Sequence, residues 1–247
     1  MDGRSVISPR FKLKEPAMCL INISKLRLLA VVAAAFLFQG CAMMDRFLGE
    51  EEYDKPASQL MMEGMEAFER GRYEAATESF QQLKDRYPYS KYAVQAELKM
   101  ADAFYKRELY DDAFDAYDEF ETLHPKNRRI PYVIYQKGMC HFEQVRSIDR
   151  DQSHTIKAKE EFERLLKKYS ESYHAKRARR KIRECFVHLA SYELYVARFY
   201  FKKGKYRTAM GRYLYLLENY PDFGQYHEAL EYLSRCKRLL AREKEKP

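Results

Sequence analysis

The sequence predicts an all-α protein in which helical hairpins stack into a solenoid, and three observations support this fold class. Glycine and proline are scarce, with 9 and 8 of 247 residues, about 7% together where about 12% is average. Hydrophobic residues make up 46% of the chain and aromatic residues 15%, which excludes a disordered chain. A pattern of small, aromatic and proline residues also recurs at fixed spacing. We therefore expect about nine helices rather than a barrel or a sandwich.

Residues 1–40 are predicted to be a lipoprotein signal peptide. Lys25 and Arg27 precede an apolar run over 28–38. Eleven helical residues span about 16 Å, roughly half of a bilayer's hydrocarbon core, so this run is a signal-peptide core and not a membrane span. Residues 38–41, Phe-Gln-Gly-Cys, resemble a bacterial lipobox, which implies cleavage before Cys41 and lipidation of its thiol with acyl chains such as palmitate. Alternatively, Cys41 is an ordinary thiol behind a secretory signal or in a short anchor, and Met18 is a second plausible start.

Residues 42–55 are polar, and residues 41–55 are predicted to form a short tether that reaches at most about 45–50 Å from the lipidated cysteine. The formal net charge of the whole chain is +8. Residues 1–40 contribute six basic and two acidic side chains, so about +4 is left once the signal peptide is removed. Such a mild positive charge does not require a nucleic-acid partner, and a periplasmic location would exclude one.

Four copies of one pattern follow the tether, within residues 56–242. Three copies keep one frame: Gly64, Ala67, Gly71, Tyr73, Ala76, Phe80, Leu83 and Pro88; Ala101, Phe104, Glu108, Tyr110, Ala113, Tyr117, Phe120 and Pro125; Ala197, Tyr200, Gly204, Tyr206, Ala209, Tyr213, Leu216 and Pro221. The remaining copy, third along the chain, starts with Gly138, His141 and Phe142, takes an eight-residue insertion, and resumes with Ala158, Phe162, Leu165 and Ser170. The pattern resembles the tetratricopeptide repeat, whose small residues let two helices approach and whose proline ends the second helix.

The repeat frame predicts each element in order. Every copy is a helical hairpin with a tight turn, at Gly71, Glu108 or Gly204 in the three uninterrupted copies. Residues 173–203 contain no helix breaker, so one long helix is expected to bridge repeats three and four. Residues 225–242 form a final amphipathic helix, and residues 243–247 form a charged tail.

Candidate catalytic and metal-ligating patterns are missing from the sequence. No nucleotide-binding glycine loop, nucleophile elbow or zinc-site spacing is present, and the six histidines never lie at a ligand spacing. We therefore expect no enzyme, no metal and no cofactor. A repeat-borne hydrolase would need a nucleophile–base pair that is not found. Cys140, Cys185 and Cys236 are expected to be small buried residues, although a disulfide between two of them stays open. The basic run 176–183 is most simply a solvated helix face.

The candidate binding surface follows from the inward positions of the first helix of each repeat in this family. Eight apolar or aromatic residues occupy these positions: Met61, Met65, Phe68, Leu98, Tyr105, Tyr135, Met139 and Phe142. Asp102 and Tyr132 lie at inward positions too. One interpretation is an open groove for an extended, aromatic-bearing peptide, since methionine adapts its shape to a ligand. The other is a tight superhelix in which these residues pack on each other.

Local stretches resemble the BamD family, the lipoprotein subunit of the outer-membrane β-barrel assembly machine. The resemblance extends from Cys41 to about residue 240 and is carried by 148–152, 158–162, 169–173 and 219–222. It implies a lipid-anchored scaffold on the periplasmic face of the outer membrane. Its C-terminal repeats would bind a POTRA domain of BamA, through Arg212, beside other Bam lipoproteins. Its N-terminal repeats would bind β-barrel precursors, with Tyr87 near them.

Two further expectations follow from this resemblance. Members of the family usually have a tenth helix, whereas the helices predicted here end with the ninth, so contacts of a tenth helix are not expected. The alternative function is that of another periplasmic repeat lipoprotein, a CpoB-like coordinator of cell-wall synthesis. Those proteins carry an N-terminal coiled coil, for which residues 42–56 are too short.

Overall fold

The computed structural model describes residues 55–221 and 224–245, and these residues contain nine α-helices and no β-strand. The helices are α2 (Ala57–Glu69), α3 (Tyr73–Arg86), α4 (Ala93–Lys106), α5 (Tyr110–Leu123), α6 (Ile130–Glu143), α7 (Ser153–Lys168), α8 (Tyr173–Lys202), α9 (Tyr206–Asn219) and α10 (Tyr226–Lys244). The predicted signal peptide, Cys41 and nearly all of the tether lie outside the described residues, so these expectations stay predictions. Within the described ranges, no helix is both long enough and apolar enough to cross a membrane.

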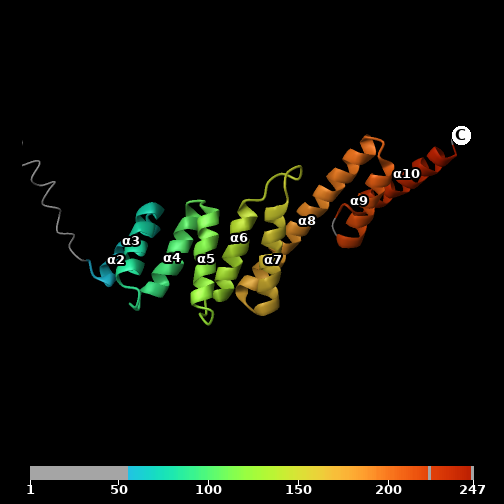
Figure 1. The fold of residues 1–247 in the computed structure, drawn as a ribbon. Helices are drawn as coiled ribbons and strands as arrows, with labels where there is room; N and C mark the ends of the chain where they lie inside the picture. Colours follow the sequence, from blue (N-terminus) through green and yellow to red (C-terminus); the bar gives the residue numbers. More distant parts are fainter. Residues whose placement is uncertain (1–54, 222–223, 246–247) are drawn as a thin grey trace, which may run out of the picture. The chain divides into compact units, whose positions relative to one another are not determined.

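Helices that follow one another in the sequence pack against one another (Figure 1). Every consecutive pair from α2 and α3 to α9 and α10 is in contact, and α6 also contacts α8. The hairpins are α2–α3, α4–α5, α6–α7 and α8–α9, followed by α10. This arrangement, in which each unit contacts mainly its neighbours, is that of a tetratricopeptide-repeat solenoid. The predicted fold class is confirmed.

The tight turns lie where the repeat frame places them. Gly71 and Gly204 have φ angles of 74° and 71°, and Glu108, at the same position of the second repeat, has a φ of 61°. A side chain at such an angle costs roughly 1–2 kcal/mol, because Cβ crowds the backbone carbonyl oxygen. Glu108 therefore has a backbone conformation that favours glycine, and the geometry of the tight turn requires it.

Two glycines allow the closest approach between the helices of a hairpin. A Cβ atom on Gly64 would lie 2.5 Å from the ring of Phe80, and one on Gly138 would lie 2.5 Å from the ring of Phe162. Both phenylalanine side chains are fully buried. The first and third repeats therefore share one packing solution, in which the missing glycine side chain makes room for a phenylalanine ring.

The insertion of the third repeat divides into two parts. Residues 144–152 connect α6 to α7, whereas three residues, 107–109, connect α4 to α5. Helix α7 also begins two residues earlier, relative to Ala158, than α5 does relative to Ala113. Six of the eight inserted residues therefore lengthen the connection, and two lengthen the helix.

The long helix and the final helix follow the sequence expectation closely. Helix α8 begins after Ser172, whose hydroxyl accepts a hydrogen bond from the Ala175 amide at 3.0 Å, a typical N-cap. It continues to Lys202 and supplies the first helix of the fourth hairpin, as predicted. Helix α10 extends to Lys244, two residues past its predicted end, so the charged tail begins as helix.

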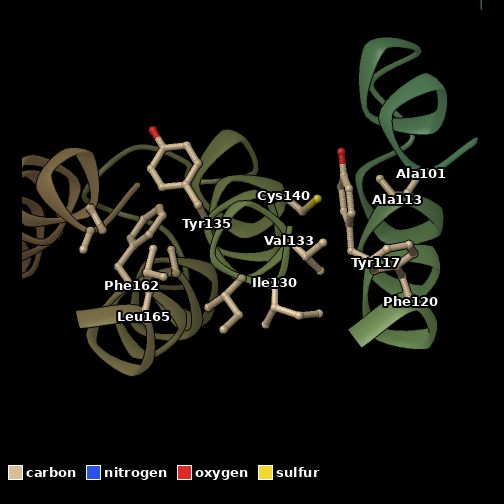
Figure 2. Packing of buried hydrophobic residues seen from close by; sticks show 14 of the residues in the cluster. Ala101, Ala113, Tyr117, Phe120, Ile130, Val133, Tyr135, Cys140, Phe162 and Leu165 are labelled. Carbon is tan, nitrogen blue, oxygen red and sulfur yellow. The ribbon is translucent and has the colours of Figure 1, made fainter. Parts of the chain in front are cut away.

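The largest core cluster joins hairpins along the solenoid (Figure 2). Side chains of α6, including Ile130 and Val133, lie between Tyr117 and Phe120 of α5 and Phe162 of α7. The same cluster includes residues of α4 and α8. Because one core spans several hairpins, the orientation of each helix is fixed by both of its neighbours.

The three described cysteines support the packing interpretation. Cys140, Cys185 and Cys236 are all buried and carry free thiols, so none forms a disulfide with another. Burial raises the pKa of the Cys140 and Cys185 thiols to about 12. These thiols therefore stay protonated and unreactive at neutral pH.

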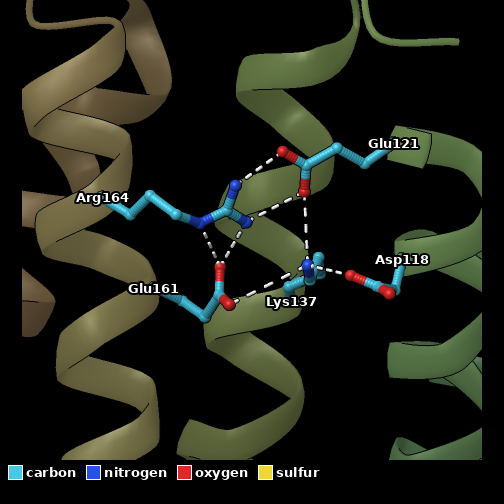
Figure 3. Close-up of polar contacts among 5 residues, drawn as sticks. All are labelled: Asp118, Glu121, Lys137, Glu161 and Arg164. Carbon is cyan, nitrogen blue, oxygen red and sulfur yellow. Dashed lines mark hydrogen bonds and ion pairs between the residues drawn. The ribbon is translucent and has the colours of Figure 1, made fainter.

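An ion-pair network around the buried Lys137 side chain connects α5, α6 and α7 (Figure 3). The Lys137 ammonium of α6 lies 2.5 Å from Asp118, 3.2 Å from Glu121 and 3.8 Å from Glu161. Arg164 of α7 contacts Glu121 at 2.6 and 2.9 Å and Glu161 at 2.5 and 3.0 Å. The two parallel contacts between Arg164 and Glu121 fix the relative orientation of the two side chains. The network therefore holds α6 in a defined position between its neighbours.

Candidate peptide-binding groove

The predicted inward residues divide into a buried and an accessible set. Met61, Leu98 and Tyr135 are buried and belong to the hydrophobic cores. The other five are half-buried and pack on the edge of a core: Met65, Phe68, Tyr105, Met139 and Phe142. The tight-packing interpretation therefore describes the three buried residues, and the open-groove interpretation describes the five half-buried ones.

A cavity of about 400 Å³ opens on this surface between α2, α4, α6 and α8. Four of the predicted residues line it: Phe68, Tyr105, Tyr135 and Met139. The remaining lining residues are Lys99, Asp102, Lys106, Tyr132, Gln136 and Arg177. A cavity of this size accommodates a few side chains of a bound peptide.

A second cavity, of about 470 Å³, adjoins the first. Its lining residues are Lys91, Val94, Gln95, Leu98, Lys99, Asp102, Phe120, Asn127, Arg128, Arg129 and Tyr132. Lys99, Asp102 and Tyr132 line both cavities. The two cavities therefore form one groove, which we call the Asp102 groove.

Asp102 is the centre of a hydrogen-bond network between the two cavities. Its Oδ1 atom accepts hydrogen bonds from the hydroxyls of Tyr117 at 2.7 Å and Tyr132 at 2.6 Å. Its Oδ2 atom accepts one from the Lys99 ammonium at 3.1 Å. Burial, and then the nearby Asp102 charge, raise the pKa of Tyr117 and Tyr132 far above the usual tyrosine value. Both hydroxyls therefore stay protonated and donate to Asp102. The hydrogen bond from Tyr132 fixes the position of its ring in the groove wall.

Cations cover three aromatic residues of the predicted surface. Lys99 lies 4.8 Å from the ring centre of Phe68, and Lys181 lies 3.9 Å from that of Phe142. The Arg177 guanidinium lies 4.6 Å from the ring centre of Tyr135. Arg177 and Lys181 belong to the basic run 176–183, so for these two residues the solvated-face interpretation is wrong. The sequence did not indicate these contacts, since α8 follows the three hairpins that carry the predicted residues.

The groove is electropositive as a consequence. Its two cavities are lined by six cationic side chains and one carboxylate, Asp102. A ligand that fits this surface carries negative charge next to apolar or aromatic groups, since cations and aromatic faces lie within one cavity. A peptide with an aromatic side chain and a nearby carboxylate has this chemistry.

The other predicted site residues lie elsewhere. Tyr87 ends α3 and packs, half-buried, against the first core, and it does not line the Asp102 groove. Arg212 of α9 is partly exposed, and its guanidinium lies 3.1 Å from Glu193 of α8, a carboxylate that is 8% exposed. Arg212 therefore has an internal partner, which the sequence pattern did not indicate. Among the residues the structure describes, no three histidine, cysteine or acidic side chains gather where they could hold a metal ion.

Comparisons with known proteins connect this architecture to one family. Residues 53–247 match the family model YfiO, described as an outer membrane lipoprotein. The chain is 30% identical over 224 residues to outer membrane protein assembly factor BamD of Xylella fastidiosa, covering 86% of this chain and 76% of that protein. It is 29% identical over 202 residues to the protein of the same name from Caulobacter vibrioides, covering 82% of this chain and 66% of the relative.

Among solved structures, the TPR2AB domain of yeast Sti1 in complex with pHSP90 aligns with a TM-score of 0.43 and 13% identity, covering 74% of this chain and 70% of that one. The match to the family model includes every residue from α2 to α10. The chain belongs to the YfiO family of outer membrane lipoproteins.

Proposed function

We propose that this chain is a non-catalytic scaffold for the assembly of outer-membrane β-barrel proteins. Its relatives are named outer membrane protein assembly factor BamD, which supports this role. In this proposal Cys41 carries the lipid anchor on the periplasmic face of the outer membrane. The C-terminal repeats bind a POTRA domain of BamA beside other Bam lipoproteins, and the N-terminal repeats hold β-barrel precursors before insertion into the membrane.

The Asp102 groove is the single observation that carries this proposal. Its walls are aromatic, its two cavities adjoin, and cations lie over its aromatic rings. These features can hold a ligand without a reaction on it. An extended precursor segment places alternate side chains on one side, so neighbouring cavities can each take one of them. A scaffold that holds such a segment near BamA raises its local concentration at the point of insertion.

The ion pair of Arg212 determines how its predicted contact with BamA should be tested. Replacing Arg212 by glutamate would place two carboxylates together in a half-buried position and would disturb the contact between α8 and α9. Arg212→Gln removes the cation without adding a charge. Glu193→Gln is the matched control, because it breaks the same ion pair and leaves the guanidinium available to a partner.

Co-purification of BamA with the full-length, membrane-anchored chain is the measurement. We expect Arg212→Gln to lower the yield of BamA at least several-fold, and Glu193→Gln to leave it unchanged or to raise it. Equal losses in the two variants would show that the internal ion pair alone matters. An unchanged yield with Arg212→Gln would remove the assignment.

The lipid anchor is tested separately through Cys41→Ala. We expect this variant to leave the membrane fraction, because a diacylated cysteine is what makes retention stable. Tight membrane association of Cys41→Ala would indicate an uncleaved anchor or retention by a partner instead.

A further inference from the structure

The connections between successive hairpins lie on one edge of the first three repeats, and the turns within the hairpins lie on the opposite edge (Figure 1). Helices α2, α4, α6 and α8 therefore all begin at the first edge, and Lys55, which precedes α2, lies there too. We call this surface the connection edge. It consists of the three connections after α3, α5 and α7, each with three helical residues on either side: 84–95, 121–132 and 166–175.

The three parts of the connection edge adjoin one another. Lys91 of the first part and Arg128 of the second line the same cavity. Tyr132 of the second part and His174 of the third lie with their ring centres 5.4 Å apart. The connection edge is therefore one continuous surface across three hairpin boundaries.

The two edges of these repeats differ in charge. The connection edge contains eight lysine or arginine residues and three acidic residues, a formal net charge of +5. The opposite edge, counted with the same flanking residues over 67–75, 104–112 and 141–155, contains six basic and eight acidic residues, a net charge of −2. Positive charge is thus concentrated on the edge at which α2 begins.

Most of the cations on the connection edge are uncompensated. Lys84 is paired with Glu119 at 2.9 Å. Six others are exposed and form no ion pair with a carboxylate of the described residues: Lys91, Lys126, Arg128, Arg129, Lys167 and Lys168. Because each of the three parts contributes at least one of them, the free positive charge extends along the whole edge.

Two exposed tyrosines lie among these cations. Tyr89 of the first connection is 100% exposed, and Tyr173, at the start of α8, is 68% exposed. Tyrosine is enriched at membrane–water interfaces, where its ring meets the apolar boundary and its hydroxyl stays in water. Free cations together with exposed tyrosines are complementary to a layer of anionic lipid headgroups.

Two observations favour a bilayer over an acidic protein as the occupant of this edge. Four of the six free cations are lysines, and lysine is depleted at protein interfaces, whereas lysine and arginine both attract anionic lipid. The proposed lipid anchor, Cys41, also precedes Lys55 by only 14 residues. A flexible chain of that length has a root-mean-square span of about 20 Å, so the anchor would keep the start of α2 close to the bilayer.

We propose that the connection edge lies against the anionic phospholipid headgroups of the membrane that holds the anchor, with its lysines and arginines on lipid phosphates and Tyr89 in the interface. The inference rests on the proposed function for the anchor alone. Lys91, Arg128 and Arg129 also line the second cavity of the Asp102 groove. A precursor bound in that groove is thereby held next to the bilayer.

Dye fluorescence of the full-length, lipidated chain on vesicles tests this inference. The environment-sensitive dye NBD is attached to a cysteine that replaces Tyr89 or, as the control, Ile148 in the insertion on the opposite edge. Cys140, Cys185 and Cys236 are buried and do not compete for the dye. We expect emission at position 89 to be at least about twofold stronger on phosphatidylcholine vesicles with about 30% phosphatidylglycerol than on phosphatidylcholine alone. This gain should disappear in about 1 M salt, which screens charges beyond about 3 Å, and position 148 should show no gain.

Charge-removal variants outside the groove separate the connection edge from the groove. Three lysines belong to the edge but line neither cavity: Lys126, Lys167 and Lys168. Each basic side chain near an anionic surface strengthens the attraction about fivefold, so replacing all three by glutamine should remove most of the gain at position 89. The matched control replaces three exposed cations of the opposite edge by glutamine: Arg72, Arg146 and Arg150. This control should keep the gain, and circular dichroism confirms that each variant is folded.

Flotation with the vesicles reports on the anchor separately. A chain that floats with both kinds of vesicle but gives equal emission at position 89 on them would overturn the inference and leave the proposed anchor standing. A gain at position 89 in a chain that does not float with neutral vesicles would support the inference and contradict the anchor. An equal gain at positions 89 and 148, or a full gain after the three lysines are replaced, would also overturn the inference.

Discussion

Replacing Asp102 by alanine tests the network that shapes the groove. The carboxylate is 8% exposed and accepts three hydrogen bonds, two from tyrosine hydroxyls and one from Lys99. Removing it leaves the Tyr117 hydroxyl without its charged acceptor inside the core, where the side chain is 0% exposed. Tyr132 and Lys99 are only partly buried, so water replaces their lost partner.

The size of the effect follows from these burial differences. A hydrogen bond to a charged group contributes about 1.5–3 kcal/mol, and a buried unsatisfied hydroxyl costs about 1–3 kcal/mol. Relief from burying the carboxylate offsets part of this loss. We therefore expect Asp102→Ala to lower the free energy of unfolding by about 2–4 kcal/mol, most of it through Tyr117.

A double-mutant cycle with Tyr117→Phe isolates that contribution. Urea unfolding is followed by circular dichroism for the two single variants and the double variant. Tyr117→Phe removes the hydroxyl that loses its hydrogen-bond acceptor when Asp102 is replaced. We therefore expect the double variant to be more stable than additivity predicts by about 1–2 kcal/mol, which is well above the usual additivity error of about 0.5 kcal/mol. Additive effects, or a loss below about 1 kcal/mol for Asp102→Ala, would refute the reasoning.

Three further predictions follow from the fold. Glu108→Gly should raise the free energy of unfolding by about 0.5–1 kcal/mol in thermal melts, because glycine relieves the positive φ, whereas Glu108→Ala should give no such gain. Gly138→Ala should lower the free energy of unfolding by about 1–3 kcal/mol, because its Cβ atom would clash with Phe162. Gly211→Ala should not lower it, because a Cβ atom there meets no atom within 4 Å, and equal effects of the two substitutions would refute the packing argument. Burial, and then the charges of Lys157 and His154, lower the pKa of His141 to about 4. As the pH drops from about 6.5 to 4, the imidazole is therefore protonated in the unfolded state before it is protonated in the folded state, and the free energy of unfolding falls. His141→Phe should make urea midpoints less sensitive to pH over that range, and an unchanged slope would contradict this.

The repeat frame made most of the fold predictable from the sequence. Small residues such as Gly64 and Gly138 mark the contacts within hairpins, and a fixed spacing from them locates the turns, Glu108 included. The insertion length followed from the same frame, as a departure from its regular spacing. The long helix followed from the absence of a helix breaker over residues 173–203.

The groove was only partly predictable, because it depends on how successive hairpins are oriented. Each repeat places its inward residues alike, yet Tyr135 is buried while Met139, four residues on, stays accessible. The cations over the rings come from α8, a different part of the chain. The network around Lys137 joins three helices through residues 16 to 43 positions apart, and its charged side chains are not among the small, aromatic and proline positions that repeat.

The ion pair of Arg212 escaped prediction for a related reason. Its partner Glu193 lies 19 residues earlier, on a helix whose charges form no repeat of their own. A conspicuous cation in a sequence can therefore have a structural partner that only the coordinates reveal.

Photocrosslinking from the groove during β-barrel synthesis tests the central claim most directly. A benzoylphenylalanine replaces Tyr105, which lines the first cavity, and Leu123, an exposed residue outside the groove, is the control position. The scaffold account predicts that position 105 captures barrel precursors briefly, that position 123 does not, and that released precursors keep an unchanged mass. Equal capture at both positions, no precursor at position 105, or a cleaved or modified precursor would contradict it.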